Sequence, residues 1–436
     1  MLSFIYFEFK ALVAGPFTAI LAFLLLSMAL FAAYNGHQRV AKQRATLREV
    51  NQKAEDFYAK NRLLLDSIEK GLRKPVETWY KDPTNPLPMS AFRGAGRYAT
   101  LPPAPLAVIS TGQSDIFPYY TKVALGDENA ADDNQSFENP FNTATGQFDL
   151  AFVLTFILPL FIVALGYNVL SAEREQGTLL LLLSMPINIK YWMLHKMWFR
   201  YGVLFLSTVA IVSFSLAVFG VTLAQPAFAW LLLSIGLYTL FWFGLCFGIN
   251  LLGRSSANNA LMLLGAWLFF TLLVPSLANL TATALYPVPS RVQYVNALRA
   301  AQNKAEQEKE GILVAFYSKN PRFVRKKQEA DKTWRDWWRE NLAEGDYLAQ
   351  LTTQTKLKFD TQAQVQRGFA NRFRYLSPTI MMQNALNQLA GTDTQTYLQF
   401  HQRTAEFEQR WSAYFKAKFL NDEKLTTKDF ERFPTY

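Results

Sequence analysis

Residues 201–253 have the sequence YGVLFLSTVAIVSFSLAVFGVTLAQPAFAWLLLSIGLYTLFWFGLCFGINLLG, and this stretch, which contains no Asp, Glu, Lys or Arg, decides the fold. Its only break is Gln225-Pro226, a pair typical of a tight turn. A helix of a soluble protein keeps one charged face in water. By contrast, roughly 20 uncharged apolar residues form a helix that crosses a hydrocarbon core of about 30 Å. The stretch therefore predicts two membrane-spanning helices joined by a short turn.

Three further uncharged runs, at residues 11–38, 150–172 and 255–290, show the same pattern. The rest of the chain carries almost all of the charge, although half of all residues are apolar. We therefore expect an all-α polytopic membrane protein. The five predicted spans are residues 17–34, 150–170, 201–223, 227–252 and 260–286.

Residues 1–15 are aromatic and apolar with one acid and one base, which predicts an interfacial helix lying on the membrane. The alternative is that they simply begin the first span, which we place at residues 16–34. Pro16 provides a natural break between the two segments. No small-x-small cleavage site closes the apolar run convincingly, so we do not expect a cleaved signal peptide.

The short loops set the predicted orientation. The loop between the third and fourth spans has no charge, whereas the loops at the other end of the spans are basic. Their basic residues are Arg174, Lys190, Lys196, Arg200 and Arg254. Basic loops face the cytoplasm. The N-terminus is then cytoplasmic, and residues 35–148 and 287–436 lie on the opposite side.

The first outside segment begins with a predicted long helix from residue 38 to about residue 74, which has no Pro and no Gly before Gly71. Its apolar stripe recurs at steps of three and four, and packs either within the chain or on another protein. The stripe is Leu47, Val50, Ala54, Phe57, Asn61, Leu64 and Ile68. The remainder, rich in Pro, Asn, Gly and Asp, predicts an irregular subdomain with a short strand at residues 106–110.

The second outside segment is predicted to be a mainly helical extracytoplasmic domain, built together with the first segment. Its expected helices are residues 292–310, 321–342, 347–375, 378–390 and 394–419. The cluster Trp334, Trp337 and Trp338 lies among arginines and has two interpretations. It is either a ligand platform with cation–π contacts or, as we favour, one face of a packed amphipathic helix near the membrane surface.

Composition excludes several classes of function. The single cysteine, Cys246, permits no disulfide within the chain, and the three histidines show no metal-ligand spacing. No G-x-x-x-x-G-K-[ST], H-E-x-x-H or G-x-S-x-G motif occurs. The formal charge of +10 is spread over wet segments where acids and bases alternate, so it does not indicate nucleic-acid binding. We therefore expect neither an enzyme nor a cofactor or metal site in this chain.

Ionisable residues are also missing from the middle of every predicted span. Ion-coupled carriers and proton pumps need such groups. The thin polar lining that remains consists of Thr155, Ser207, Ser213, Asn250 and Asn279. If the protein performs work, we expect another subunit to supply the energy.

The segment at residues 172–200, AEREQGTLLLLLSMPINIKYWMLHKMWFR, is the most distinctive loop. Charged residues follow the second span, Gly177-Thr178 allows a bend with a helix start that Thr178 can cap, and Pro186 stops a short apolar helix. A helix of this length cannot span the membrane. It either lies on the membrane as a re-entrant loop or docks into a groove on a partner protein, and the spacing alone does not distinguish the two.

One motif of this segment resembles the part of ABC-2 type permeases that follows their second span. The motif is Glu173-Arg174-Glu175-Gln176-Gly177-Thr178-Leu179, then Leu182-Leu183-Ser184-Met185-Pro186, and finally Lys196. These permeases are the membrane subunits of ABC transporters with the type V exporter fold. In that family the segment forms a coupling helix that sits in a cleft of the ATPase, and residues 1–14 are similar to the family's elbow helix.

The resemblance implies a role for each matching residue. Glu173 and Glu175 are the contact and hinge charges, Gly177 the bend and Pro186 the stop. The residues that the resemblance assigns to ATPase coupling are Glu173, Arg174, Glu175, Gly177, Thr178, Leu179, Leu182, Pro186 and Lys196.

The resemblance covers about residues 1–34 and 149–286, and it implies a permease subunit in a bacterial cytoplasmic (inner) membrane. The implied partners are a cytoplasmic ABC ATPase that binds ATP and Mg, a second permease subunit, identical or related, an extracytoplasmic partner protein, and membrane lipid. The large outside segments are similar to those of the gliding-motility and nitrous-oxide-accessory branch. The family has six spans, and the sixth that it leads us to expect is missing from this sequence: either the chain continues past residue 436 or the final span is lost.

Two functions of such a subunit stay open. It could export a substrate, or it could transmit force through the stalk to an extracytoplasmic partner while nothing crosses the membrane. The long stalk favours the second. A different class, a structural or receptor-type membrane protein with a helical interaction domain and no ATPase partner, is the alternative to both.

Overall fold

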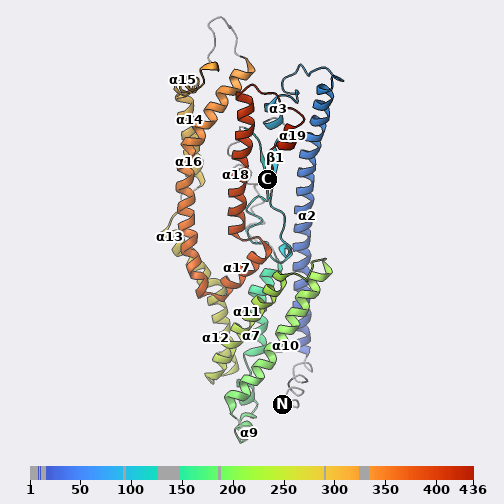
Figure 1. Cartoon of the computed structure of the whole chain (residues 1–436). Helices are drawn as coiled ribbons and strands as arrows, with labels where there is room; N and C mark the ends of the chain where they lie inside the picture. Colours follow the sequence, from blue (N-terminus) through green and yellow to red (C-terminus); the bar gives the residue numbers. More distant parts are fainter. Residues whose placement is uncertain are drawn as a thin grey trace.

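The computed structural model describes residues 8, 10, 16–91, 95–125, 148–184, 188–288, 291–323 and 333–436. Within these residues the protein is all-α apart from one two-stranded sheet, which confirms the predicted fold class. Five helices are long and apolar enough to cross a membrane, as predicted: Pro16–Glu69, Leu150–Glu175, Ile189–Val218, Pro226–Leu251 and Ser256–Leu285. Figure 1 shows the spans at one end and the outer domain at the other. Of the predicted interfacial helix only Glu8 and Lys10, both helical, are described, and the rest lies outside the described residues.

Spans two and five each contain a π-helical turn directly before a proline. Span two consists of α6 (Leu150–Phe152), η2 (Val153–Ile157), α7 (Leu158–Gly166) and α8 (Ser171–Glu175). Span five consists of α12 (Ser256–Leu268), η3 (Phe269–Leu273) and α13 (Val274–Leu285). A proline has no backbone N–H for the carbonyl one turn earlier. The π turns therefore coincide with the places where Pro159 and Pro275 interrupt the helical hydrogen bonds.

Other elements supply the donors that these turns need. The Tyr238 hydroxyl on α11 (Pro226–Leu251) donates to the Thr155 carbonyl at 2.6 Å. The Trp267 indole donates to the Phe156 carbonyl at 3.1 Å, and the Ser377 hydroxyl donates to the Phe270 carbonyl at 2.7 Å. No water is present in the hydrocarbon core to take their place. The Tyr238 and Trp267 bonds thus join spans four and five to span two, and the Ser377 bond joins the outer segment to span five.

Ser377 caps α17 (Pro378–Ala390), so this helix of the outer segment packs directly on the membrane bundle. The sequence predicted α17 with the observed bounds but as part of a separate outer domain. Instead its Met382, Leu386 and Ala390 belong to the same buried core as the spans. Figure 1 shows α17 at the junction between the two halves of the molecule.

The first span continues without a break into the stalk as the single helix α2 (Pro16–Glu69). Two members of the predicted stripe, Leu47 and Ala54, are buried, but the other five are half-buried. The fully buried line is instead Val40, Gln43, Leu47, Ala54, Tyr58 and Leu65. It packs on the protein's own outer domain, which supports the intramolecular interpretation of the stripe. The predicted end near residue 74 is about one turn too late.

The predicted strand at residues 106–110 is wrong, because residues 107–109 form the 3₁₀ turn η1 (Ala107–Ile109) against α2. The observed strands are β1 (Arg97–Thr100) and β2 (Tyr120–Val123), which pair antiparallel with Arg97 opposite Val123. Period-2 alternation cannot distinguish a buried 3₁₀ turn from a short strand over so few residues.

The outer domain has its own aromatic core. This core lies between α2, α3 (Pro86–Ser90), the two strands, α18 (Thr394–Leu420) and α19 (Asp429–Arg432). Trp411, Phe407 and Phe415 of α18 are fully buried there, and Tyr58 meets them from the stalk. Burial of an aromatic side chain of this size contributes on the order of 1.5–3 kcal/mol. These contacts keep α18 parallel to the stalk in Figure 1.

A helical arm completes the outer half. It consists of α14 (Arg291–Gln307), α15 (Lys309–Lys319), η4 (Pro321–Phe323), α16 (Trp334–Arg372) and η5 (Phe373–Leu376). The predicted break between residues 342 and 347 is wrong, because α16 runs through Gly345 as one helix. The predicted helix 292–310 is divided after Gln307. Helices α13 and α16 pack together and connect the arm to span five.

Trp334 confirms the packed interpretation of the tryptophan cluster but not its position. Its ring stacks nearly parallel on the Trp79 ring, with 4.5 Å between the ring centroids. Trp79 follows the outer end of α2 along the chain, whereas Trp334 belongs to the arm. At about 1.5 Å per residue, that end lies roughly 50 Å beyond the membrane. The cluster therefore packs at the far end of the molecule and not near the membrane surface, while Trp337 stays 53% exposed.

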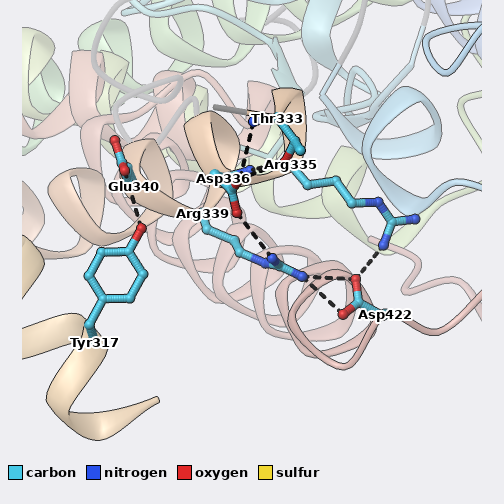
Figure 2. A network of polar contacts seen from close by, with 7 residues as sticks. All are labelled: Tyr317, Thr333, Arg335, Asp336, Arg339, Glu340 and Asp422. Atoms are coloured by element: carbon cyan, nitrogen blue, oxygen red, sulfur yellow. Dashed lines mark hydrogen bonds and ion pairs between the residues drawn. The ribbon is translucent and has the colours of Figure 1, made fainter. Parts of the chain in front are cut away.

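Asp422 joins the arm to the end of α18 (Figure 2). Both of its oxygens accept from Arg339 Nη2 at 2.9 Å, and Arg335 pairs with it as well. Asp422 has a φ of +54°, the left-handed conformation that Asp tolerates better than most residues after a helix end. Thr333 and Asp336 form a capping box that starts α16 beside this ion pair. The network thus fixes the first turn of α16 against α18.

We expect Asp422→Ala to lower the stability of the outer domain by about 1–3 kcal/mol, because it leaves the nearly buried Arg339 without its main acceptor. Asp422→Gly loses the same ion pairs, but glycine adopts the left-handed conformation without strain. It should therefore lower the stability less than Asp422→Ala does, yet still lower it. Thermal unfolding in detergent, with Asp56→Ala on the exposed side of α2 as the control, measures both. Equal stability of Asp422→Ala and the control would rule out this joint.

Candidate functional site

The inner end of the molecule is formed by α8, the short helix α9 (Leu179–Ser184) and the beginning of α10 (Ile189–Val218). Figure 1 shows α9 at the tip opposite the outer domain, at the same end of the molecule as the start of α2. α10 begins at Ile189, well before the predicted start of the span at residue 201. Its first turns carry charged residues such as Lys190 and Lys196, so we place them outside the membrane. Segment 172–200 therefore lies at one end of the bundle.

Lys196 is the centre of a partly buried ion cluster. Its Nζ lies 2.9 Å from Glu173 Oε1 and 3.2 Å from Glu8 Oε1. The Lys196 and Glu8 side chains are only 12% and 9% exposed, so water screens these contacts weakly. The ammonium also lies 4.8 Å from the centre of the Trp192 ring. The cluster connects the N-terminal segment, span two and α10.

Thr178 and Gly177 form the bend between α8 and α9. The Thr178 hydroxyl donates to Glu173 Oε2 at 2.5 Å, and its carbonyl accepts from Leu182 N, which begins α9. Gly177 has a φ of +76°, a left-handed conformation that is costly for side chains other than those of Asn and Asp. Nothing lies within 4 Å of a Cβ placed there, so the backbone angle and not crowding requires the glycine.

Arg174 and Glu175 point sideways to the turn between spans four and five. Glu175 accepts from the Ser256 backbone N–H and hydroxyl, both at 2.8 Å, which places a carboxylate at the first turn of α12. Arg174 donates to the Arg254 carbonyl at 3.1 Å. Both side chains therefore join span two to span five at the inner end.

Helix α9 is a row of five leucines that buries none of its residues. Leu180, Leu181 and Leu183 are 77%, 65% and 58% exposed, while Leu179 and Leu182 are half-buried. Pro186, the predicted stop, lies outside the described residues. The arrangement is a short apolar helix projecting from a charged base.

Polar side chains continue outward from this base between the spans. Asn250 donates to the Gly166 carbonyl at 2.8 Å and accepts from Leu170 N, so it joins spans two and four. Asn259 donates to the Tyr167 carbonyl at 3.1 Å and joins spans two and five. Beyond them lie the π turns and Tyr238, which lead to α17.

The structure thus groups the predicted residues in three ways. Glu173, Thr178 and Lys196 meet in one cluster, Arg174 and Glu175 contact the neighbouring turn, and Leu179 and Leu182 lie half-buried on α9. Sequence reasoning missed Glu8, Tyr238, Asn259 and Ser377. The detectable signals were an asparagine next to the start of a span, and a proline inside each of two spans, which demands a donor from elsewhere. Among the described residues no His, Cys, Asp and Glu side chains gather that could hold a metal ion.

Comparisons with known proteins add a partial match. Residues 291–436 match a protein family described as "Domain of unknown function (DUF3526)", which begins at α14 and includes the arm, α17, α18 and α19. The match covers less than half of the chain and leaves out the spans and segment 172–200. No curated protein matches the chain, and no solved structure matches it either.

We expect Lys196→Met to destabilise the inner end by about 1–3 kcal/mol, because two partly buried carboxylates then face each other without a cation. Lys190→Met on the exposed side of the same helix is the matched control. The midpoint of thermal unfolding in detergent should fall only for Lys196→Met. Equal midpoints would show that the cluster does not hold these segments together.

Tyr238→Phe should cost about 1 kcal/mol, since the Thr155 carbonyl loses its donor inside the membrane while packing is kept. Tyr167→Phe is the control, because the Tyr167 phenol has no hydrogen bond to the part of the chain that the structure describes. Unfolding midpoints of the two variants, measured in the same lipid nanodiscs, give the comparison. A Tyr238→Phe protein as stable as the control would contradict the role assigned to this bond.

Proposed function

We propose that this chain is the membrane subunit of an ABC transporter of the ABC-2 type, and that α9 docks into a cytoplasmic ATPase. The observation that carries the proposal is the exposure of α9. A helix on a membrane surface needs a polar face toward water, whereas Leu179 to Leu183 surround α9 with leucine side chains on every side. A helix that is apolar all round is stable when it is enclosed. A groove on a partner protein encloses it, and a membrane surface covers only one side.

The contacts at the base of α9 would transmit a movement of this helix to the spans. The Lys196 cluster and the Glu175 contact hold α8 firmly to α10 and α12, and Gly177 provides the bend at which α9 projects. Nucleotide binding and hydrolysis, with ATP and Mg, belong to the partner in this proposal. Movement of α9 would then displace spans two, three and five together.

The outer end favours force transmission over export through a single chain. Thr155 and Asn250 are buried at 0% and 1% exposure. The Thr155 backbone carbonyl accepts from Tyr238 of span four, and the Asn250 side chain donates to the Gly166 carbonyl of span two. They hold helices together and do not line an open path. At the outer end of the bundle, α17 packs on α11 and on both π turns. A displaced span therefore moves α17 and, with it, the outer domain.

α17 is also fastened to the outer domain. The Ser110 hydroxyl donates to Asn387 at 2.6 Å, and Gln113 N donates to the Thr392 carbonyl at 2.8 Å. Gly112, with a φ of +50°, lies against Thr392, where a Cβ would be 2.4 Å from its hydroxyl. In this proposal, movement passes from the inner end through the spans and α17 to the outer domain, and from there to an extracytoplasmic partner.

A second permease subunit, identical or related, completes the proposal. Only 17% of the apolar stretch of span five is buried by contacts within this chain, and only 22% of the apolar stretch of span one. Spans two and four are far better covered, at 61% and 39%. Spans one and five therefore present the faces that a second subunit or lipid covers in the inner membrane.

The test is a gentle detergent pull-down of the chain from its native cells, with ATP hydrolysis assayed on the eluate. We expect an ATPase to elute with the wild-type chain and to be lost with the double variant Leu180→Ser and Leu183→Ser. Gly177→Pro, which cannot adopt a positive φ, should release it as well. Leu72→Ser, at a leucine 76% exposed outside the membrane, is the matched control.

Either of two results would reject the coupling role: no ATPase elutes with the wild-type chain, or it elutes equally with the Leu180→Ser and Leu183→Ser variant. The alternative, a structural or receptor-type protein without an ATPase, would then explain the large outer domain better. Unfolding midpoints of the variants show that they are folded, because serine at exposed positions removes no buried contact.

A further inference from the structure

A groove of about 480 Å³ lies where the stalk leaves the membrane. One wall is a single face of α2, and the other combines residues 103–105 and Val108 with residues 219–222, the turn between spans three and four. Its volume falls in the range of small-molecule sites, about 300–1,000 Å³. The α2 residues of the groove are His37, Val40, Ala41, Arg44, Ala45 and Arg48.

The groove has a basic rim and an apolar wall. Arg44 and Arg48 are exposed and one helical turn apart, and neither has a hydrogen bond or ion pair with any residue that the structure describes. Ala41 and Ala45 lie beside them and leave room for a ligand. None of the described residues that line the groove is acidic, and Pro103, Pro105 and Val221 give it an apolar side. Free guanidinium groups next to apolar surface suit an amphipathic anion.

The position of the groove matches the lipid headgroup layer. The turn at residues 219–222 joins two spans, so it marks the outer membrane boundary, and the Phe219 ring contacts Tyr34 and His37 of α2 at 6.1 and 5.5 Å. α10 and α2 lie side by side here (Figure 1). Arg44 is seven residues beyond His37, or about 10 Å. Side chains on a helix incline toward its N-terminus, which for α2 is toward the membrane.

We propose that this groove binds the headgroup of an anionic phospholipid. Arg44 and Arg48 hold the phosphate, and the apolar wall with Phe219 covers the glycerol and the first carbons of the acyl chains. Charge complementarity and continuity with the membrane surface favour a lipid over a soluble ligand. The site does not depend on an ATPase at α9, which lies at the other end of the spans.

The test uses the full chain in mixed micelles that hold phosphatidylglycerol and phosphatidylcholine in equal amounts, with native mass spectrometry of the lipid retained. We expect the wild-type protein to retain phosphatidylglycerol preferentially. Arg44→Ala should weaken that retention roughly tenfold, the order expected for one charge-assisted hydrogen bond, and the double variant Arg44→Ala and Arg48→Ala should abolish the preference. Alanine favours a helix, so both variants should fold.

Lys42→Ala is the matched control, because Lys42 lies at the same height on α2 but outside the groove. It should leave retention unchanged. If Lys42→Ala lowers retention as much as Arg44→Ala, the attraction is a general surface charge and the site is disproved. The same conclusion follows if Arg44→Ala retains lipid like the wild type. Displacement of the lipid by excess inorganic phosphate would identify a free anion as the ligand and overturn the lipid assignment.

Discussion

The need to satisfy backbone carbonyls without water determines how this membrane bundle is assembled. Pro159 and Pro275 each interrupt a span, and a freed carbonyl in hydrocarbon costs several kcal/mol if it stays unpaired. Tyr238, Trp267 and Ser377 supply hydroxyl or indole donors to the two π turns. Because each donor comes from a different element, satisfying the carbonyls also fixes spans four and five and α17 around span two.

This constraint brings the two halves of the molecule into one packed body. α17 belongs to the sequence of the outer segment, yet its N-cap Ser377 bonds to span five and its apolar face belongs to the same buried core as the spans. Its other end joins the loop at residues 110–113, which Arg39 and Asp149 attach to the stalk and to span two. Burial raises the pKa of the Asp149 carboxyl, while backbone donors from Thr111 and Phe152 oppose that rise. Motion of the bundle and motion of the outer domain are therefore difficult to separate.

The sequence predicted the features that depend on local pattern. Uncharged runs located all five spans, and Pro378 with Gly391 bounded α17 to the residue, because proline at a helix start and glycine at its end are strong signals. It could not predict that α17 enters the bundle, since that depends on partners more than a hundred residues away. The 3₁₀ turn at residues 107–109 was mistaken for a strand for the same reason, as Arg39 and Asn387 determine its shape. In segment 172–200 the composition identified the residues, but only the structure separated Glu175, which joins span five, from Glu173, which joins Lys196.

α10 connects the two ends at which we propose that this protein binds other molecules. Its first turns hold Lys196 in the inner ion cluster, and its last turn leads to Phe219 beside the basic groove. As one helix of 30 residues it spans about 45 Å without proline, so it moves as a rigid rod. A displacement at the inner end therefore reaches the turn that forms the wall of the groove. Lipid held between that turn and Arg44 would resist the displacement, which makes the outer leaflet a physical load on any motion driven from α9.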